Sequence, residues 1–382
     1  MTFDKVYQYN FPTIIRFGPG AIKELPAYLQ KNGLKRPMIV TDPTIASLPF
    51  FKSILTDLNR HHLSAEVFSA IHKNPVKSDV YKGTELWDHT SRDSIIGIGG
   101  GAALDVARSI VLRVNHREDL FKYDDLIGGD IYVINDVPHF IAVPTTAGTG
   151  SEVGRSAIIA DDETHQKKIL FSPKLIAKIV FADPVLTMDL PSFITAATGM
   201  DALTHNLEAF LAKNPHPLCD GIALEGIYLI KDAIETATHQ PDIESRSKML
   251  MASMMGAIAF QKGLGVVHSL AHPLSSLLDT HHGLANAVNL PYGMEFNITG
   301  FEDRFRRIAR TLELKEETGE AVVRYLFDLN SKINIPHSLN EIGVKPAHIE
   351  ILADLALADF AHPNNPKPVS RENFKQLYLK AL

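Results

Sequence analysis

Two pairs of side chains that can bind metal stand at helical spacing in the second half of the chain. Asp201 and His205 are four residues apart within a run of good helix formers. Positions i and i+4 point the same way on a helix, so this carboxylate and this imidazole share one face. His268 and His272 repeat the same spacing. The pattern predicts helix faces that could each offer two ligands to one metal ion.

A third group, His281 and His282, follows after a short run. One Asp and up to four His suit a divalent transition metal, because imidazole binds Zn, Fe, Ni or Cu and the carboxylate adds a harder oxygen. A single His on an apolar helix is more often a hydrogen-bonded core residue, and His272 could be a structural imidazole before Pro273. Together the groups favour a metal site, but spacing alone does not separate His268 from His272, or His281 from His282.

Strands alternate with helices through the first half of the chain. We predict strands at 37–41, 94–98 and 140–143, a weaker strand at 65–69, and helices at 78–90 and 102–114. This alternation is typical of a parallel sheet covered by helices.

After Pro184 the pattern is helical only, with predicted helices at 195–212, 220–238, 245–261, 266–278, 301–312 and 316–332. We therefore predict an α/β, Rossmann-like N-terminal domain with a parallel sheet (residues 1–185). An all-α C-terminal domain that carries the metal and catalytic residues (residues 186–382) should follow it.

Residues 97–102 fit the pattern G-x-G-x-x-G/A, follow a predicted strand and open a predicted helix. Backbone N–H groups in such a loop can bind a pyrophosphate, although the pattern equally fits a tight strand-to-helix turn. The acidic residue that could bind a ribose, Asp42, lies on an earlier strand instead of about 20 residues after the glycines. A carboxylate there favours NAD(H) over NADP(H), unless Asp42 only caps the turn at Pro43.

The composition describes an ordinary globular chain of 382 residues, 45% hydrophobic and 21% charged, with a net charge of −6. Its charge gives no electrostatic case for nucleic acid or an anionic membrane. The single cysteine, Cys219, excludes an intrachain disulfide and indicates a reducing, cytoplasmic compartment. Residues 1–7 lack the features of a secretory signal, and the most apolar run, 249–260, is too short to span a bilayer.

Seven short motifs in one order resemble the iron-containing (group III) alcohol dehydrogenases. Each is weak alone, but their order is specific and they extend over nearly the whole chain. They lie at residues 17–20, 97–105, 144–152, 183–184, 199–209, 263–273 and 282–287. The resemblance implies the architecture shared with dehydroquinate synthase. It also implies hydride transfer between NAD(H) and a primary or secondary alcohol, or its aldehyde or ketone, with the metal acting as a Lewis acid.

The same resemblance implies the metal ligands Asp201, His205, His268 and His282. Iron(II) is the usual metal of the family, and zinc(II) fits the same ligands. His272 is then placed next to the nicotinamide as the catalytic proton relay, and the role of His281 stays open.

The resemblance also implies a set of cofactor-binding residues. Asp42 would face the adenosine ribose and Asn74 the adenine side. The residues implied at the diphosphate and the nicotinamide ribose are Gly99, Gly100, Gly101, Asp105, Thr145, Thr146 and Thr149. Ala102 departs from the serine that the family usually has there, which removes one hydroxyl but leaves the backbone donors.

Three other hypotheses about the class of protein are possible. A zinc enzyme similar to glycerol dehydrogenase would lack the histidine at position 205. A lyase similar to dehydroquinate synthase would have Glu in place of Asp201 and a different loop at 145–152. A non-enzymatic binding module remains the third. We expect a small alcohol or carbonyl compound as substrate and a homodimer or higher homo-oligomer, and no residue indicates which substrate it is.

Overall fold

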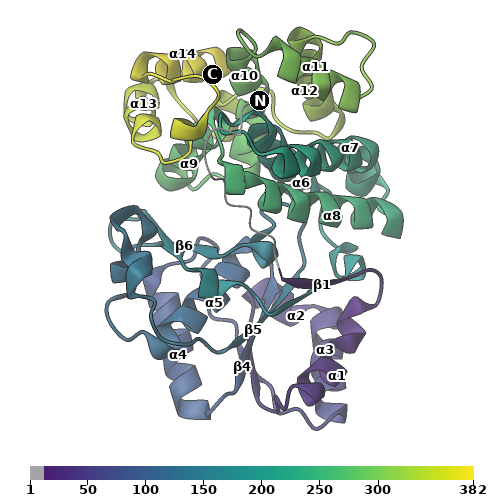
Figure 1. The fold of residues 1–382 in the computed structure, drawn as a ribbon, viewed down its shortest axis with the longest axis vertical. Helices are drawn as coiled ribbons and strands as arrows, with labels where there is room; N and C mark the ends of the chain where they lie inside the picture. Colours follow the sequence, from purple (N-terminus) through teal and green to yellow (C-terminus); the bar gives the residue numbers. More distant parts are fainter. Residues whose placement is uncertain (1–12) are drawn as a thin grey trace. The chain divides into compact units, whose positions relative to one another are not determined.

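The chain forms two compact units in a computed structural model that describes residues 13–382 (Figure 1). An α/β unit comprises residues 13–146 and 150–189, and a helical unit comprises residues 147–149 and 190–382. A parallel α/β part followed by a helical part confirms the predicted fold class. The domain boundary between residues 185 and 186 stays a prediction. The expected lack of a signal in residues 1–7 lies outside the described residues.

The α/β unit is built on one six-stranded sheet in the order β1-β8-β5-β4-β2-β3. Every pair of neighbouring strands is parallel. The strands are β1 (Ile14–Phe17), β2 (Pro37–Val40), β3 (Glu66–Phe68), β4 (Ser94–Gly99), β5 (His139–Pro144) and β8 (Ile179–Ala182). The predicted strands correspond to β2, β3, β4 and β5. The two strands at one edge, β1 and β8, were not predicted.

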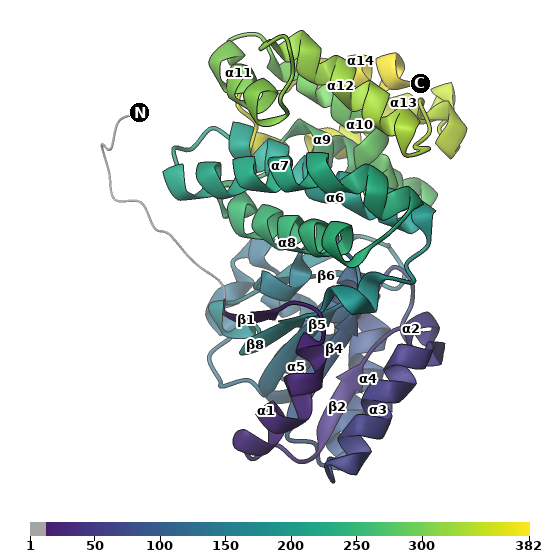
Figure 2. The ribbon, with the colours of Figure 1, turned by 90° about the vertical axis from the view of Figure 1, so that its right-hand side faces the viewer.

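Helices cover both faces of this sheet, which explains why β2 and β4 are buried at every residue. On one face lie α1 (Leu25–Lys31) and α3 (Pro49–Arg60) (Figure 2). Their side chains pack on those of the strands. The apolar cluster there includes Leu29, Leu58, Ile39, Ile96 and Ile141. On the other face, α5 (Gly101–Asn115) packs on β4 and β5, and α4 (Lys77–Thr90) packs on α5.

The carboxyl ends of β2, β4 and β5 meet at one edge of the sheet. Val40 is paired with Gly97, and Gly99 is paired with Pro144. The segments that follow these strands therefore leave the sheet at the same edge. Helix α2 (Pro43–Ser47) follows β2 there, and a separate antiparallel pair, β6 (Ser156–Ala160) and β7 (Lys167–Phe171), comes later in the chain.

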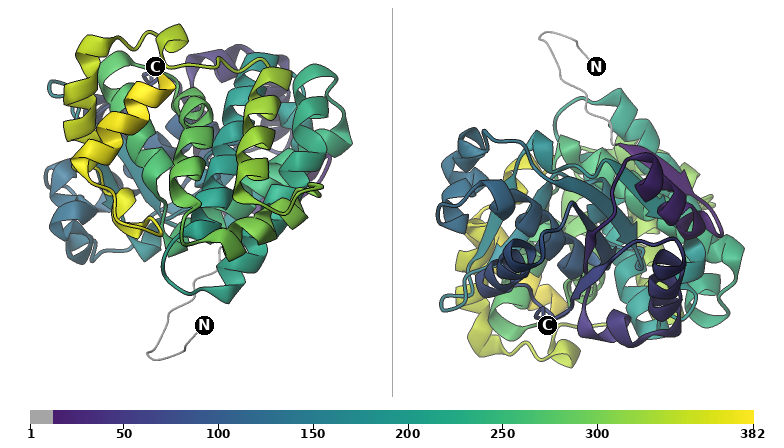
Figure 3. Two further views of the ribbon diagram at one scale, coloured as in Figure 1. Left: turned by 90° about the horizontal axis from the view of Figure 1, so that it is seen from above. Right: turned by 90° about the horizontal axis from the view of Figure 1, so that it is seen from below.

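The helical unit is organised around α6 (Ser192–Leu211), which is buried at nearly every position from Thr195 onward. It packs against α7 (Pro217–His239), α8 (Ile243–Ala259) and α10 (His282–Asn297). Figure 2 labels α6, α7 and α8 side by side, and the left view of Figure 3 shows the helical unit from above, coloured teal to yellow. The remaining helices are α9 (Val266–Leu278), α11 (Glu302–Thr311), α12 (Gly319–Lys332), α13 (Ile349–Leu357) and α14 (Arg371–Ala381).

Among the described helices, none taken singly combines the length and apolar character needed to cross a membrane. One pair, 243–262 with 266–278, reaches that length and composition only together, and it is bent by 108° at its break.

Candidate active site

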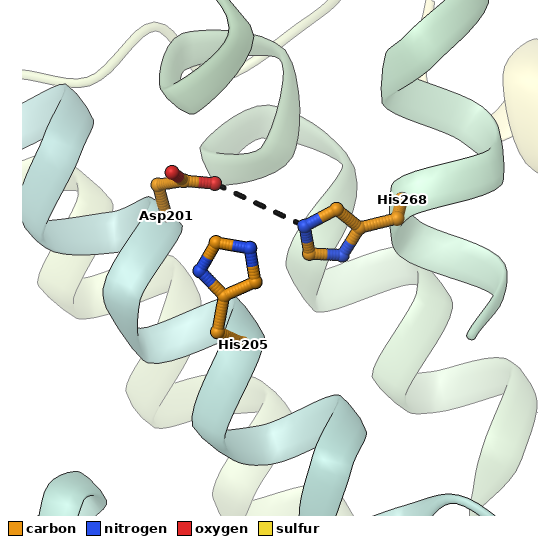
Figure 4. Close-up of side chains that lie close together, drawn as sticks. All are labelled: Asp201, His205 and His268. Atoms are coloured by element: carbon orange, nitrogen blue, oxygen red, sulfur yellow. Dashed lines mark ion pairs between the residues drawn. The ribbon is translucent and has the colours of Figure 1, made fainter. Parts of the chain in front are cut away.

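Asp201 and His205 of α6 and His268 of α9 form a buried cluster. Their ligand-bearing atoms all lie within 4.8 Å of one another. Figure 4 shows the two residues of α6 facing His268 across the space between the helices, with Asp201 Oδ1 4.0 Å from His268 Nε2. The His205 and His268 rings stack with their centroids 4.6 Å apart. The helical spacing of Asp201 and His205 thus brings both side chains to one place in the fold.

His282, the first residue of α10, joins this cluster with its Nε2 3.4 Å from Asp201 Oδ1. The next residue, Gly283, allows the close approach of α10 to α6. A Cβ at Gly283 would lie 2.8 Å from the Ala197 carbonyl carbon and 3.3 Å from Asp201 Cβ. His281, by contrast, packs its ring against Phe193 with centroids 6.4 Å apart.

The charge balance of the cluster suits a cation. Burial alone would raise the pKa of Asp201, but the His205, His282 and His268 imidazoles and the Asn286 amide lower it to about 2. Burial holds the pKa of His268 well below its ordinary value, which favours the neutral imidazole that metals bind. His205 Nδ1 is buried and has no hydrogen-bond partner among residues 13–382. A carboxylate beside imidazole nitrogens is the donor set that a transition metal binds.

Asn286, one turn after His282 on α10, also belongs to the cluster. Its Nδ2 donates to Asp201 Oδ1 at 2.7 Å and lies 3.2 Å from His282 Nε2 and 3.4 Å from His268 Nε2. The amide is therefore in contact with three of the four candidate ligands.

Glu208, one turn after His205 on α6, holds the start of α9. Its Oε2 lies 2.6 Å from His268 Nδ1, and its Oε1 accepts a hydrogen bond from Val267 N at 2.6 Å. Burial raises the pKa of Glu208 to about 7, although the backbone donors of Gly265, Val267 and His268 act in the opposite direction.

His272 has a carboxylate partner of its own, since its Nδ1 lies 2.7 Å from Asp359 Oδ2. Asp359 Oδ1 accepts from Ser269 Oγ at 2.6 Å and from Ala361 N at 2.9 Å. Burial would raise the pKa of Asp359, but His272 and these donors lower it below its ordinary value. The His272 ring stacks on that of His282 with centroids 5.3 Å apart, next to the metal cluster.

In the α/β unit, the glycine loop lies at the edge where β2, β4 and β5 end. Gly99 has φ of 153°, which favours glycine, and a Cβ there would lie 2.7 Å from Ala103 Cβ and 3.7 Å from Asp42 Oδ2. Gly100 caps α5, Gly101 begins it, and a Cβ at Gly100 would lie 3.2 Å from Thr146 Oγ1. The N-terminus of a 15-residue helix thus opens beside Thr146, and its backbone N–H groups suit a phosphate. The Asp42 carboxylate lies next to the preceding Gly99.

Two acidic residues of the candidate cofactor site also have protein partners. Asp42 caps α2, because its Oδ1 accepts from Ile45 N at 2.9 Å. Asp42 therefore caps the turn, which was one of the two roles predicted from the sequence, and its other oxygen, Oδ2, lies beside Gly99. Asp105 accepts from Ser151 Oγ at 2.8 Å and, through its other oxygen, from Ile158 N at 3.1 Å. The structure thus gives Asp105 a bracing role, and its contact with the diphosphate stays a prediction.

The other candidate cofactor residues are dispersed. Thr145 has a buried hydroxyl without a hydrogen-bond partner in the described part of the chain, as expected of a residue that awaits a ligand. Asn74 lies in the loop between β3 and α4. Thr149 belongs with residues 147–149 to the helical unit, where Ser253 Oγ donates to the Gly148 carbonyl at 3.1 Å.

No functional role was predicted from the sequence for Glu208, Asn286 or Asp359. Two of them carried a usable signal. Glu208 stands seven residues after Asp201, and Asn286 stands four after His282, so each shares a helix face with a candidate ligand. Asp359 is 87 residues from the histidine that it contacts, and no local spacing could have indicated it.

Comparison with known proteins matches both units of the chain. The family model described as iron-containing alcohol dehydrogenase matches residues 12–184. The one described as Fe-containing alcohol dehydrogenase family, C-terminal, matches residues 195–382. A 4-hydroxybutyrate dehydrogenase of Cupriavidus necator is 35% identical over 380 residues, which is 97% of this chain and 98% of the relative.

Two solved structures are similar over almost their full length. A 1,3-propanediol oxidoreductase superposes with a TM-score of 0.95 at 30% identity, covering 99% of this chain and 100% of the other. The sulfoacetaldehyde reductase of Bifidobacterium kashiwanohense, solved in complex with NAD⁺, has a TM-score of 0.88 at 25% identity and covers 99% of each chain.

Proposed function

The chain belongs to the iron-containing alcohol dehydrogenase family, NAD-dependent oxidoreductases that act on alcohols, and on that premise we propose its metal, residue roles and substrate class. Iron(II) is held by Asp201, His205, His268 and His282. The substrate is a small primary alcohol or its aldehyde. The observation that carries the proposal is the buried cluster of one carboxylate and two imidazoles with ligand atoms within 4.8 Å.

The donor set supports a metal of intermediate hardness. Imidazole nitrogens with one carboxylate oxygen suit iron(II) and zinc(II), and iron(II) is the family's namesake. When bound, such a metal supplies Lewis-acid activation of the substrate oxygen.

His272 is proposed to move the hydroxyl proton. Because Asp359 Oδ2 accepts from Nδ1, the neutral ring presents an unprotonated Nε2, the atom that can accept a proton. Asp359 also fixes the orientation of the ring, since Ser269 and Ala361 hold the carboxylate in place. A purely structural imidazole would leave the turnover of His272→Ala near that of the wild type, whereas the loss of a proton relay would lower it.

For the cofactor, we propose that the Gly99–Gly101 loop binds the NAD(H) diphosphate and that Asp42 binds the adenosine ribose. The helix N-terminus behind the loop and the position of Asp42 Oδ2 beside Gly99 support this assignment. Asn74, Thr145, Thr146 and Thr149 are proposed as the further contacts.

The substrate class is proposed from the relatives. 4-Hydroxybutyrate, 1,3-propanediol and sulfoacetaldehyde are short molecules with a terminal hydroxyl or aldehyde and a polar group at the other end. We propose a substrate of this type, and a homo-oligomeric, cytoplasmic enzyme.

The test measures alcohol-dependent reduction of NAD⁺ to NADH. The protein is first loaded with Fe²⁺ or Zn²⁺ under anaerobic conditions. A panel should include short primary alcohols, 1,3-propanediol, 4-hydroxybutyrate, glycerol and a secondary alcohol, with chelator-treated protein as control. Stoichiometric NADH from a terminal alcohol supports the proposal. Glycerol as the only substrate would favour the glycerol dehydrogenase alternative, and no net NADH with any alcohol would contradict the proposal.

A further inference from the structure

We infer that Glu208 is a positioning residue of the metal centre, which holds His268 in the tautomer that presents Nε2 to the metal and fixes the start of helix α9. The inference rests on the proposed function of Asp201, His205 and His268 as metal ligands. Glu208 is not itself a proposed ligand, and it acts through His268 and through the backbone at the start of α9.

The hydrogen bonds of Glu208 determine the tautomer. Both carboxylate oxygens accept backbone N–H bonds, Oε1 from Val267 at 2.6 Å and Oε2 from His268 at 3.4 Å. As a carboxylate, Glu208 can only accept, so in this pairing the His268 Nδ1 that lies 2.6 Å from Oε2 carries the hydrogen. The Nε2 lone pair is then left for the metal, and Nε2 is the atom on the side of Asp201, 4.0 Å from its Oδ1.

The same carboxylate ties two helices together. Glu208 follows Asp201 and His205 on one face of α6, so two candidate ligands and the partner of a third come from one rigid helix. At the start of α9 the carboxylate accepts hydrogen bonds from backbone N–H groups that have no partner within the helix. Negative charge is also favourable at a helix N-terminus. Asn365 Oδ1 accepts a further hydrogen bond, from Val266 N at 3.1 Å.

Gly265 shows that this contact needs close packing. A Cβ at this position would lie 2.7 Å from Asn365 Oδ1 and 2.9 Å from Glu208 Oε1, so a larger residue would displace both acceptors at the start of α9. Histidine ligands of metals commonly donate their second nitrogen to a carboxylate, and loss of such a partner typically weakens metal binding about 10- to 100-fold.

The experiment compares Zn²⁺ binding by wild type and by Glu208→Gln, using competition with a chromophoric chelator on metal-free protein. Glutamine keeps the shape and one acceptor but removes the charge, and we expect Zn²⁺ to bind about 10- to 100-fold more weakly. Asp359→Asn is the matched control, because it alters the equivalent contact on His272 and should leave Zn²⁺ affinity unchanged. The d–d absorption of Co²⁺-loaded protein should shift in Glu208→Gln and not in the control.

A purely structural role for Glu208 predicts a different result. Thermal unfolding would then show an equal loss of stability in metal-free and Zn²⁺-loaded protein, with unchanged Zn²⁺ affinity and Co²⁺ spectrum, and this would overturn the inference. If Glu208→Gln does not fold, Glu208→Asp serves instead, since it keeps every ligand but withdraws the carboxylate from His268 by one methylene, and it should also weaken Zn²⁺ binding. Wild-type protein that binds no Zn²⁺ would overturn the proposed metal site itself, which is a distinguishable outcome.

Discussion

Replacing Gly283 by alanine should disrupt the metal centre without removing any ligand. The new methyl group would lie 2.8 Å from the Ala197 carbonyl carbon of α6 and would also meet the Ala197 oxygen. Ordinary contacts between carbon atoms are about 3.5–4.0 Å, so α10 must move from α6 by about 1 Å. His282 begins α10 and must move with it, away from Asp201.

This displacement is large by the standard of metal sites, where ligand distances hold to within about 0.2 Å. If binding of about 10–16 kcal/mol is shared by four ligands, losing one costs roughly 3 kcal/mol, or about 100-fold in affinity. The strained packing should also cost about 1–3 kcal/mol of folding stability. Zn²⁺ affinity, measured by chelator competition, and thermal unfolding of the metal-free protein measure the two effects separately.

Gly221→Ala is the matched control. Gly221 lies exposed on α7, and apart from the local helix backbone no atom of residues 13–382 lies within 4 Å of the position that its Cβ would take. This change should stabilise the protein by about 0.5–1 kcal/mol and leave Zn²⁺ affinity unaltered. If Gly283→Ala bound Zn²⁺ as tightly as wild type, the reasoning that α10 fixes His282 against α6 would be refuted.

Three further predictions concern single side chains. His205→Ala should lose most of its bound metal, as elemental analysis of purified protein would show, and full metal content with full activity would remove His205 from the ligand set. His272→Ala should lower turnover by about 10²–10⁴-fold at near-normal metal content, whereas a large loss of metal would mean that the roles of His268 and His272 are exchanged. Wild type should prefer NAD(H), and Asp42→Gly should reduce that preference in kcat/KM for the two cofactors. A preference for NADP(H) in the wild type, or an unchanged ratio in the variant, would exclude Asp42 from the ribose site.

The sequence predicted those elements whose pattern is local and long. Strands β2, β4 and β5 are short, mostly apolar runs, and α7 repeats the buried residues Ala223, Ile227, Ile230 and Ile234 at three- and four-residue steps. Strand β1 was missed because it has four residues and is largely exposed at the edge of the sheet. Helix α10 was missed because Pro291 and two glycines lie inside it, although its packing against α6 and α9 compensates for these poor helix formers.

The residues of the candidate site also form two groups, those that local spacing could predict and those that it could not. Ligands that share a helix, such as Asp201 and His205, could be predicted from spacing, because four residues make about one helical turn. Partners that come from distant segments could not be predicted. Asp105 and Asp359 are examples, since their partners Ile158 and His272 lie 53 and 87 residues away. No periodicity records such a contact, which is made by the packing of whole helices and loops.

The environments of the two histidines on α9 differ in a way that spacing could not express. The His268 side chain is 1% exposed, with Glu208 on one nitrogen and the Asp201 carboxylate on the side of the other. The His272 side chain is 14% exposed, is held by Asp359 and lies against Phe360 with ring centroids 5.2 Å apart. Exposure alone does not separate a ligand from a relay, because the proposed ligand His282 is 30% exposed. Of the two histidines on α9, however, His268 is the one whose ring nitrogen lies with the ligand atoms of Asp201 and His205. This difference supports His268 as the ligand and His272 as the relay, although both stand on the same helix face one turn apart.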